Sequence, residues 1–379
     1  MSRTPADPHV FSRRLPTQAG QRARAELLGA AKGAYNQTRH MLDSHQARMP
    51  TLRVSAASSG PSTLYFLVPD FERPAGGIRV MYRHVDLLNE AGVPSAVLHR
   101  RRGFRCTWFP NETQVKYIAD TELAPHDVLV VPDVYAPLMP DLPTGLQHLL
   151  FDQSGGHLSL RRHTDRLVEH VKKSPDLLGI LTVSTHSQDL LQHIFPTRRI
   201  HRVHLSVDPS LFFLEPSSDR AGIVYLKRRG AVDAENALRV LQARDGLRST
   251  PTASLNDMSQ LELARTLRST SIFLHLPYQE GFGLPAVEAM ACGAYVLGYH
   301  GYGGREFMLP TFSSTVETGD LLGLVKQLEA ALIKERDDPG WLADRGQEAA
   351  AFIADHYRPE RERTEVLTAY QEVTQSHRR

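Results

Sequence analysis

Cysteine is scarce in this chain, which has two among its 379 residues, Cys106 and Cys292. Two cysteines this far apart cannot build the disulfide framework that holds a small secreted domain together. They are typical of free thiols in a reducing compartment. The sequence therefore predicts a cytoplasmic protein.

A long apolar run and a strong net charge are missing as well. No stretch approaches about 18 consecutive apolar residues, and the opening MSRTPADPHVFSRRLP lacks the apolar centre of a signal peptide. We therefore expect no membrane-spanning helix and no export through a signal peptide. The formal net charge of +2 argues against a general nucleic-acid-binding protein.

Metal-binding and dinucleotide-binding motifs are not found either. The 18 histidines form no H-E-x-x-H or mixed Cys/His spacing, so no catalytic or structural metal is expected. The glycine loop near residue 76 is not a G-x-G-x-x-G run, which argues against a dinucleotide cofactor and hence against a dehydrogenase. No resident cofactor is predicted.

The first 60 residues differ in pattern from the rest of the chain. Between residues 18 and 45, alanine and leucine recur at steps of three or four, which predicts a helix, and over residues 13–48 seven lysines and arginines stand against two acidic residues. Two interpretations stay open: a helix packed on the main body with a solvated basic face, or peripheral contact with an anionic membrane surface at its inner face. The run RVSAASSGPST, residues 53–63, predicts a linker.

Apolar, β-rich runs then alternate with helical patterns in two series. The first predicts a helix over 76–92 and strands at 63–69, 95–100, 115–119, 127–133, 146–153, 178–185 and 200–207. The second predicts strands at 222–230, 271–277 and 294–299, with helices at 233–244, 259–270 and 285–293. Apolar strands that alternate with helices are typical of parallel sheets covered on both faces.

The fold class predicted is therefore α/β, with two Rossmann-like domains facing each other across a cleft. The domains are 61–207 and 208–357, preceded by the basic extension 1–60, and the charged helical segment of about 358–379 is expected to pack back on the first domain. Ligands of such sheets bind beyond the carboxyl ends of the strands, so the site is expected between the domains.

The stretch YQEGFGLPAVEAMACG, residues 278–293, carries the strongest chemical signal. Gly281 and Gly283 let the backbone approach a ligand, and Pro285 suits the first turn of a helix whose free N–H groups can bind phosphate. The carboxylates of Glu280 and Glu288 can each accept two hydroxyl protons from a sugar diol. This pattern fits a nucleotide sugar; the alternative is a solvated loop acid and an acid favoured by the helix dipole.

The string EGFGLPAVEAMACG is similar to the E-x7-E signature of retaining glycosyltransferases with the GT-B fold, glycosyltransferase family 4. The resemblance is dense over residues 272–300 and looser over about 64–355. It implies that Glu288 binds the ribose of the donor nucleotide and that Glu280 contacts the donor sugar. It also implies that Gly281 and the backbone of Phe282, Gly283 and Leu284 lie near the sugar and diphosphate.

Three adjacent cations follow the first strand of the second domain, in IVYLKRRG. The family carries an arginine and a lysine there that hold the diphosphate, and such cations would stabilise charge on the leaving group. The resemblance assigns this role to Lys227 and Arg228, with Arg229 as the alternative, since the three stand closer together than the family spacing. Without the resemblance, a solvated surface turn explains them equally well.

The first domain offers weaker signals. PDFERPAGGIRVMYRHV resembles the family's glycine loop, in which Gly76 and Gly77 would let the donor phosphate or acceptor approach the helix start, although a tight turn is the alternative. In FDQSGGHLSL, the resemblance suggests His157 or Asp152 against the donor sugar. GYGGREFM resembles a family Gly-Gly-x-x-Glu motif but lacks one residue before Glu306.

The resemblance implies a retaining glycosyltransferase that moves a sugar from a nucleoside diphosphate sugar to an acceptor hydroxyl. The acceptor would be a glycan, a lipid-linked intermediate or a small molecule, in cell-surface glycan or glycoconjugate biosynthesis. Two alternatives stay open: a sugar-nucleotide epimerase or phosphorylase of the same fold, and a non-catalytic nucleotide-sugar binding module.

Overall fold

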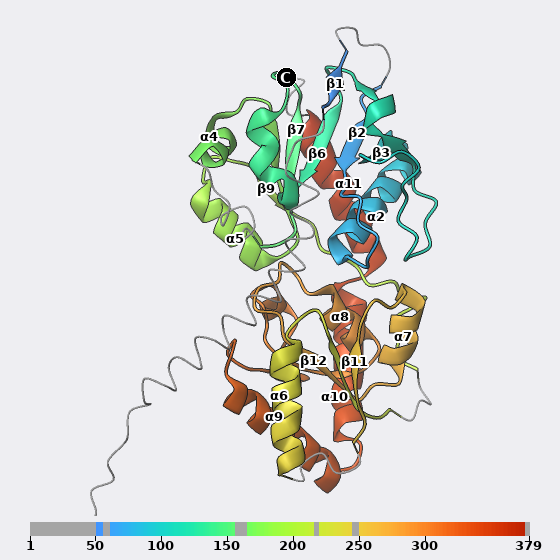
Figure 1. The fold of residues 1–379 in the computed structure, drawn as a ribbon, viewed down its shortest axis with the longest axis vertical. Helices are drawn as coiled ribbons and strands as arrows, with labels where there is room; N and C mark the ends of the chain where they lie inside the picture. Colours follow the sequence, from blue (N-terminus) through green and yellow to red (C-terminus); the bar gives the residue numbers. More distant parts are fainter. Residues whose placement is uncertain (1–50, 56–60, 156–164, 216–219, 245–249, 376–379) are drawn as a thin grey trace, which may run out of the picture.

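The computed structural model describes residues 51–55, 61–155, 165–215, 220–244 and 250–375. These residues form two α/β domains stacked along the long axis of the molecule (Figure 1), each built on a parallel sheet. The predicted α/β fold class with two Rossmann-like domains is confirmed. The predicted basic helix within residues 1–50 and His157 lie outside the described residues.

The N-terminal domain contains a seven-stranded sheet in the order β4-β3-β2-β6-β7-β8-β9. All its pairings are parallel. The strands are β2 (Leu64–Leu67), β3 (Ser95–His99), β4 (Val115–Tyr117), β6 (Val128–Pro132), β7 (His148–Asp152), β8 (Leu177–Thr182) and β9 (Ile200–Arg202). Helix α2 (Gly76–Glu90) packs on one face, and η2 (Asp133–Asp141), α4 (Asp165–Lys173) and α5 (Thr185–Ile194) cover the other.

The C-terminal domain contains a five-stranded parallel sheet in the order β11-β10-β12-β13-β14. The strands are β10 (Ile223–Leu226), β11 (Thr252–Leu255), β12 (Ile272–His275), β13 (Tyr295–Gly298) and β14 (Ser313–Thr315). Helices α6 (Ala231–Ala243) and α9 (Leu321–Asp337) pack on one face, and α7 (Gln260–Arg268), α8 (Leu284–Ala291) and α10 (Trp341–His356) on the other. Sequence reasoning did not predict α9, β11 or β14.

A single apolar core runs through both domains. It includes Phe66 and Val183 of the N-terminal domain together with Phe282, Leu284 and Phe273 of the C-terminal domain, all buried. The α2 side of the N-terminal sheet and the α8 side of the C-terminal sheet contribute to this shared core. The other side of each sheet packs in a core of its own domain. The domains are therefore joined by apolar packing as well as by the chain.

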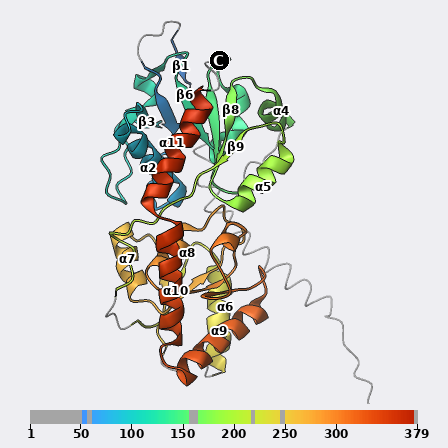
Figure 2. The same ribbon diagram turned by 180° about the vertical axis from the view of Figure 1, so that it is seen from behind.

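The C-terminal helix α11 (Pro359–Gln375) returns to the N-terminal domain, where it contacts α2, β8 and β9. Figure 2 shows it lying alongside α2. The buried carboxylate of Glu362 accepts hydrogen bonds from the Arg83 guanidinium and from the Ser206 hydroxyl. These contacts fasten the end of the chain to the first domain.

Two local predictions were wrong. The predicted linker contains a strand, β1 (Arg53–Val54), which pairs in parallel with β5 (Glu122–Leu123) and extends the ordered domain. The alternative of Glu288 as an acid favoured by the helix dipole requires it in the first turn, but α8 begins at Leu284 after the left-handed Gly283, and no acidic residue lies in that first turn. The helix dipole therefore does not explain a carboxylate at 288.

Among the described residues, no helix combines the length and the apolar character that crossing a bilayer requires.

Glu365 on α11 gives the docking of this helix a pH dependence. Burial would raise the pKa of Glu365, but hydrogen bonds from the side chain and backbone of His204 and from Arg361 outweigh it and lower the pKa from 4.5 to about 2. A carboxyl whose pKa is depressed in the folded state stabilises that state above its unfolded pKa, and this contribution is lost as the pH falls through the window from about 4.5 to about 2.

We predict that Glu365→Gln lowers the melting temperature at pH 7 and that its difference from the wild type shrinks between pH 5 and pH 3. Thermal unfolding across this range checks it. The control is Glu360→Gln, which neutralises an exposed carboxylate on the same helix. A Glu365→Gln difference that stays constant over the pH range would contradict the assigned ion pair.

Candidate functional site

A pocket lies between the two domains, where residues that follow the strands of both sheets meet. Its empty volume is about 780 Å³, including its open mouth, within the size range of small-molecule sites. Both domains contribute its walls. The lining includes Pro74, Ala75, Gly76, Gly77, Arg79, Trp108, Gln153 and Leu205 from the first domain and Leu226, Arg228, Arg229, Met258, Gln260, Glu280, Phe282, Gly283, Leu284 and Glu288 from the second.

Two helix N-termini open onto this pocket from opposite domains. Helix α2 begins at Gly76 and α8 at Leu284, and neither has a side chain capping its first N–H groups. The preceding residues, Ala75 and Gly283, also line the pocket. Because uncapped helix starts present N–H donors and the positive end of the dipole, the two together favour an anion between them.

Cations from the loop after β10 add to this positive potential. Arg228 and Arg229 line the pocket, and the Arg228 guanidinium crosses to the first domain, where it donates to the carbonyl oxygen of Pro74. Lys227 is exposed and lines a smaller neighbouring hollow with Gly230 and Tyr278. The geometry thus brings Arg228 and Arg229 to the interdomain pocket, whereas Lys227 lies beside it.

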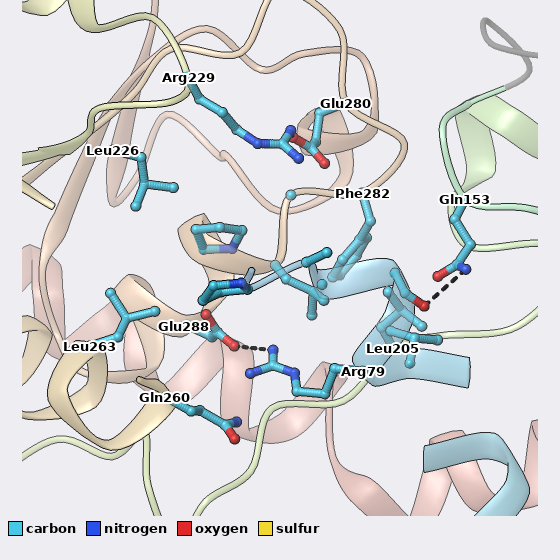
Figure 3. Close-up of a pocket in the computed structure, with 18 of the residues that line it drawn as sticks. Arg79, Gln153, Leu205, Leu226, Arg229, Gln260, Leu263, Glu280, Phe282 and Glu288 are labelled. Carbon is cyan, nitrogen blue, oxygen red and sulfur yellow. Dashed lines mark hydrogen bonds and ion pairs between the residues drawn. The ribbon is translucent and has the colours of Figure 1, made fainter. Parts of the chain in front are cut away.

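Glu280 and Arg229 form an ion pair within the second domain (Figure 3), and their side chains are 14% and 34% exposed. The backbone of Glu280 is fixed as well, because its N–H donates to the carbonyl of Gly301 at 2.8 Å and its carbonyl accepts from Gly303 at 3.2 Å. The carboxylate is therefore held at the pocket wall with a guanidinium beside it.

Glu288 lies deeper, with 3% of its surface exposed. Its carboxylate accepts a charged hydrogen bond from Arg79 of α2, a pair that joins the two domains across the pocket (Figure 3). The carboxylate points into the pocket from α8, and Gln260 lies nearby. The two glutamates of the sequence motif thus line the same pocket, Glu288 at a more buried position than Glu280, and each is paired with an arginine.

The domains also meet backbone to backbone at the glycine loop. A Cβ on Gly281 would stand 2.0 Å from the carbonyl oxygen of Gln153, so only glycine fits there. The Gln153 side chain donates to the carbonyl oxygen of Gly77 at 3.1 Å. Three segments far apart in sequence, at 77, 153 and 281, therefore form one continuous wall.

With this geometry described, comparison with known proteins becomes informative. Residues 253–338 match the model of the family Glycosyl transferases group 1. The C-terminal domain thus contains a segment similar to this family, and the fold of the chain is GT-B. The matched residues include Glu280, Glu288 and the glycine loop between them.

Individual relatives are distant. The chain is 22% identical over 238 residues to an Alpha-1,6-glucosyltransferase of Actinobacillus pleuropneumoniae serotype 7 (strain AP76), covering 60% of this chain and 69% of that protein. The fold is similar to sucrose-phosphate synthase from Thermosynechococcus elongatus, with a TM-score of 0.63, 12% identity, and coverage of 83% and 100% of the two chains. HepE from Anabaena, solved with UDP and glucose, has a TM-score of 0.57 at 13% identity, with coverage of 83% and 99%.

Glu306 connects the two domains on another side of the glycine loop. Its carboxylate accepts hydrogen bonds from the Thr185 N–H at 3.0 Å, the Arg202 guanidinium at 2.6 Å and the Tyr357 hydroxyl at 3.2 Å. Burial, and then the charge of Glu306, raise the pKa of Tyr357. The Glu306 carboxylate, whose spacing departs from the family motif, thus accepts hydrogen bonds from residues of the protein itself.

Two further predicted residues lie away from the pocket wall or outside the described chain. Asp152 ends β7 fully buried, and its carboxylate accepts from the Ser154 hydroxyl at 3.3 Å, while the neighbouring Gln153 faces the pocket. His157 lies outside the described residues. Roles for Asp152, His157 and Lys227 stay predictions.

Sequence reasoning missed Arg79, Gln153 and Trp108, which line the pocket, and His275 beneath the glycine loop. Arg79 follows the Gly-Gly pair by two positions on the same helix, a signal that could have been used. Burial, and then the charges of Arg229 and His300, lower the pKa of His275 to about 3, so this imidazole is neutral at pH 7.

No group of three or more histidine, cysteine, aspartate or glutamate side chains is arranged to hold a metal ion within the part of the chain that the structure describes. The positive groups at the pocket are the arginines that line it and the two helix starts.

We predict that Gly281→Ala destabilises the contact between the domains, because the new methyl group would meet the Gln153 carbonyl oxygen. Overpacking of this kind costs about 1–3 kcal/mol, which lowers the melting temperature by several degrees in a chain of this size. Thermal unfolding and small-angle scattering check it, the latter by an increased radius of gyration.

The matched control is Gly304→Ala in the 3-10 helix η3 (Gly303–Glu306), where a Cβ would meet the flexible Met308 sulfur at 3.3 Å. Equal stability of the two variants would show that the domains do not touch at Gly281.

Proposed function

We propose that this protein is a retaining hexosyltransferase that moves a sugar from a nucleoside diphosphate sugar to an acceptor hydroxyl, without a metal ion. The observation that carries the proposal is one pocket in which two uncapped helix starts, three arginines and two carboxylates converge. The middle of this set can bind an anion, and the carboxylate at each end can accept hydrogen bonds from hydroxyl groups. A nucleotide sugar has the same order of charge and hydroxyl groups.

The donor would lie with its ribose on Glu288, its diphosphate between α2 and α8, and its sugar toward Glu280. Arg228 and Arg229 would stabilise the negative charge that develops on the diphosphate as the bond to the anomeric carbon breaks. Because these groups come from both domains, correct alignment of donor and acceptor depends on domain closure.

Retention follows from the family resemblance of the E-x7-E string and is consistent with the surroundings of Glu280. A double displacement would need a free carboxylate nucleophile at the anomeric carbon, whereas Glu280 is paired with Arg229. In the reaction we propose, the acceptor oxygen attacks from the face that the diphosphate leaves. The bond to the phosphate oxygen breaks, the bond to the acceptor forms, and the acceptor proton passes to the departing diphosphate.

The biological setting is part of the proposal. The distant relative is named a glucosyltransferase, and HepE was solved with UDP and glucose. We therefore take UDP-glucose as the first donor to test, and a glycan, a lipid-linked intermediate or a small molecule as acceptor. The pathway would be cell-surface glycan or glycoconjugate biosynthesis.

A thermal-shift panel of UDP, GDP, ADP, dTDP and their sugars tests the donor site. At about 100 times its Kd, a ligand adds about 2.7 kcal/mol, which raises the melting temperature by at least a few degrees. We expect at least one nucleotide to stabilise the wild type but not Glu288→Ala. The control is Glu317→Ala, which removes an exposed carboxylate outside the pocket; a panel in which no nucleotide stabilises the wild type contradicts the proposal.

Glu280→Gln separates catalysis from binding. We expect kcat to fall about 100-fold, a loss typical of one transition-state contact, while the Kd for the nucleoside diphosphate changes less than about threefold, because Glu280 is assigned to the sugar, which the nucleoside diphosphate lacks. Turnover is followed as nucleoside diphosphate released from the donor that the panel identifies.

The alternative functions predict other products. Isomerised sugar nucleotide formed from donor alone would identify an epimerase, and sugar phosphate formed from a glycan and phosphate would identify a phosphorylase. Nucleotide binding without turnover against any acceptor extract would identify a binding module.

A further inference from the structure

The ion pair between Arg79 and Glu288 closes the site that the proposed function assigns to the donor ribose. Arg79 is the fourth residue of α2 and Glu288 lies on α8, so the pair joins the two domains. The side chains are 18% and 4% exposed. In Figure 3 the guanidinium lies directly against the carboxylate, on the side facing the pocket.

The pair also separates two cavities. Arg79 and Glu288 line both the interdomain pocket and a second hollow, of about 850 Å³, that continues along α2 toward Arg83 and Asn111. Gln260 and Leu284 are shared by the two cavities as well. A guanidinium at this boundary therefore occupies the space beside the carboxylate from which a ribose would approach.

Because the Glu288 side chain is only 4% exposed while Arg79 lies against it, a ribose diol cannot reach the carboxylate until the guanidinium moves aside. The vicinal diol of a ribose offers two O–H donors to one carboxylate, and Arg79 already donates to Oε1 of Glu288. Breaking a buried ion pair without replacement is strongly destabilising, because it leaves a charge uncompensated. A ligand that supplies hydroxyl donors offers such a replacement.

We propose that Arg79 is a specificity-determining latch that competes with the donor ribose for Glu288. The inference rests on the proposed function, since it takes Glu288 as the ribose-binding residue. In the unliganded protein the pair holds α2 against α8 and blocks the carboxylate. A bound nucleotide replaces the guanidinium with its diol, so ligands without suitably placed hydroxyl groups cannot release the latch.

The latch lowers nucleotide affinity by a factor set by how seldom the pair is open. If the open state makes up about a tenth of the unliganded protein or less, the apparent Kd is raised at least about tenfold over that of a permanently open site. Removing the guanidinium should therefore strengthen nucleotide binding, even though it removes a positive charge from a site for anions.

The test uses the full chain and two readouts. Isothermal titration with UDP, GDP, ADP and dTDP compares the wild type with Arg79→Ala, and we expect the variant to bind its nucleotide about tenfold more tightly. The matched control is Arg83→Ala, one turn further along α2, whose arginine pairs with Glu362; it should leave the Kd unchanged. A weaker or unchanged Kd in Arg79→Ala overturns the latch.

The second readout needs no nucleotide. Melting temperatures of Arg79→Ala, Glu288→Ala and the double variant form a cycle, and we expect the double variant to lose less than the sum of the two single losses. Additive losses would show that the pair does not form and would overturn the inference by itself. If nucleotide binding depends on Glu288 but not on Arg79, the latch is overturned and the proposed function stands. If neither the wild type nor Arg79→Ala binds any of the nucleotides, both the proposed function and the latch are overturned.

Discussion

The close approach of the glycine loop to the first domain is the constraint on which the site depends. Gly281 lies against the backbone of Gln153 with no room for a Cβ atom, and the Gln153 side chain in turn bonds the carbonyl of Gly77. These contacts set the distance between the starts of α2 and α8. Without them, the two helix starts and the arginines after β10 would not face one anion-sized space.

Charge balance is the second feature of the site. Each carboxylate of the sequence motif is already paired with an arginine, Glu288 with Arg79 from the other domain and Glu280 with Arg229 from its own. Both acids of the pocket are thus neutralised by arginines of the protein itself. The Glu280–Arg229 pair lies within one domain, so it can stay intact when the domains move apart. The Glu288–Arg79 pair joins the domains and would be broken by that movement.

The contacts that hold the domains together are of several kinds. The shared apolar core is non-directional, whereas Glu306 fixes orientation by accepting bonds from Thr185, Arg202 and Tyr357. Helix α11 crosses back to the first domain and is fastened there through Glu362 and Glu365. The relative position of the two domains is therefore fixed by contacts on several sides of the pocket. A ligand that binds between α2 and α8 would have to fit the spacing that these contacts set.

The sequence by itself determined the layer architecture and the motif. Parallel strands buried on both faces appear in the sequence as continuous apolar runs, and a helix start within Gly-x-Gly-x-Pro is a local signal. The two sheets and the motif with glutamates at 280 and 288 could therefore be found from the sequence. It could not place Arg79, Gln153 or Glu306, because their roles arise from contacts across more than 100 positions of chain. Nor could it choose among Lys227, Arg228 and Arg229, since adjacent residues after a strand point in different directions and only the packed loop decides which reach the pocket. The order of residues along the chain determines hydrophobic periodicity and turn residues. Packing between distant segments determines which side chains meet in the pocket.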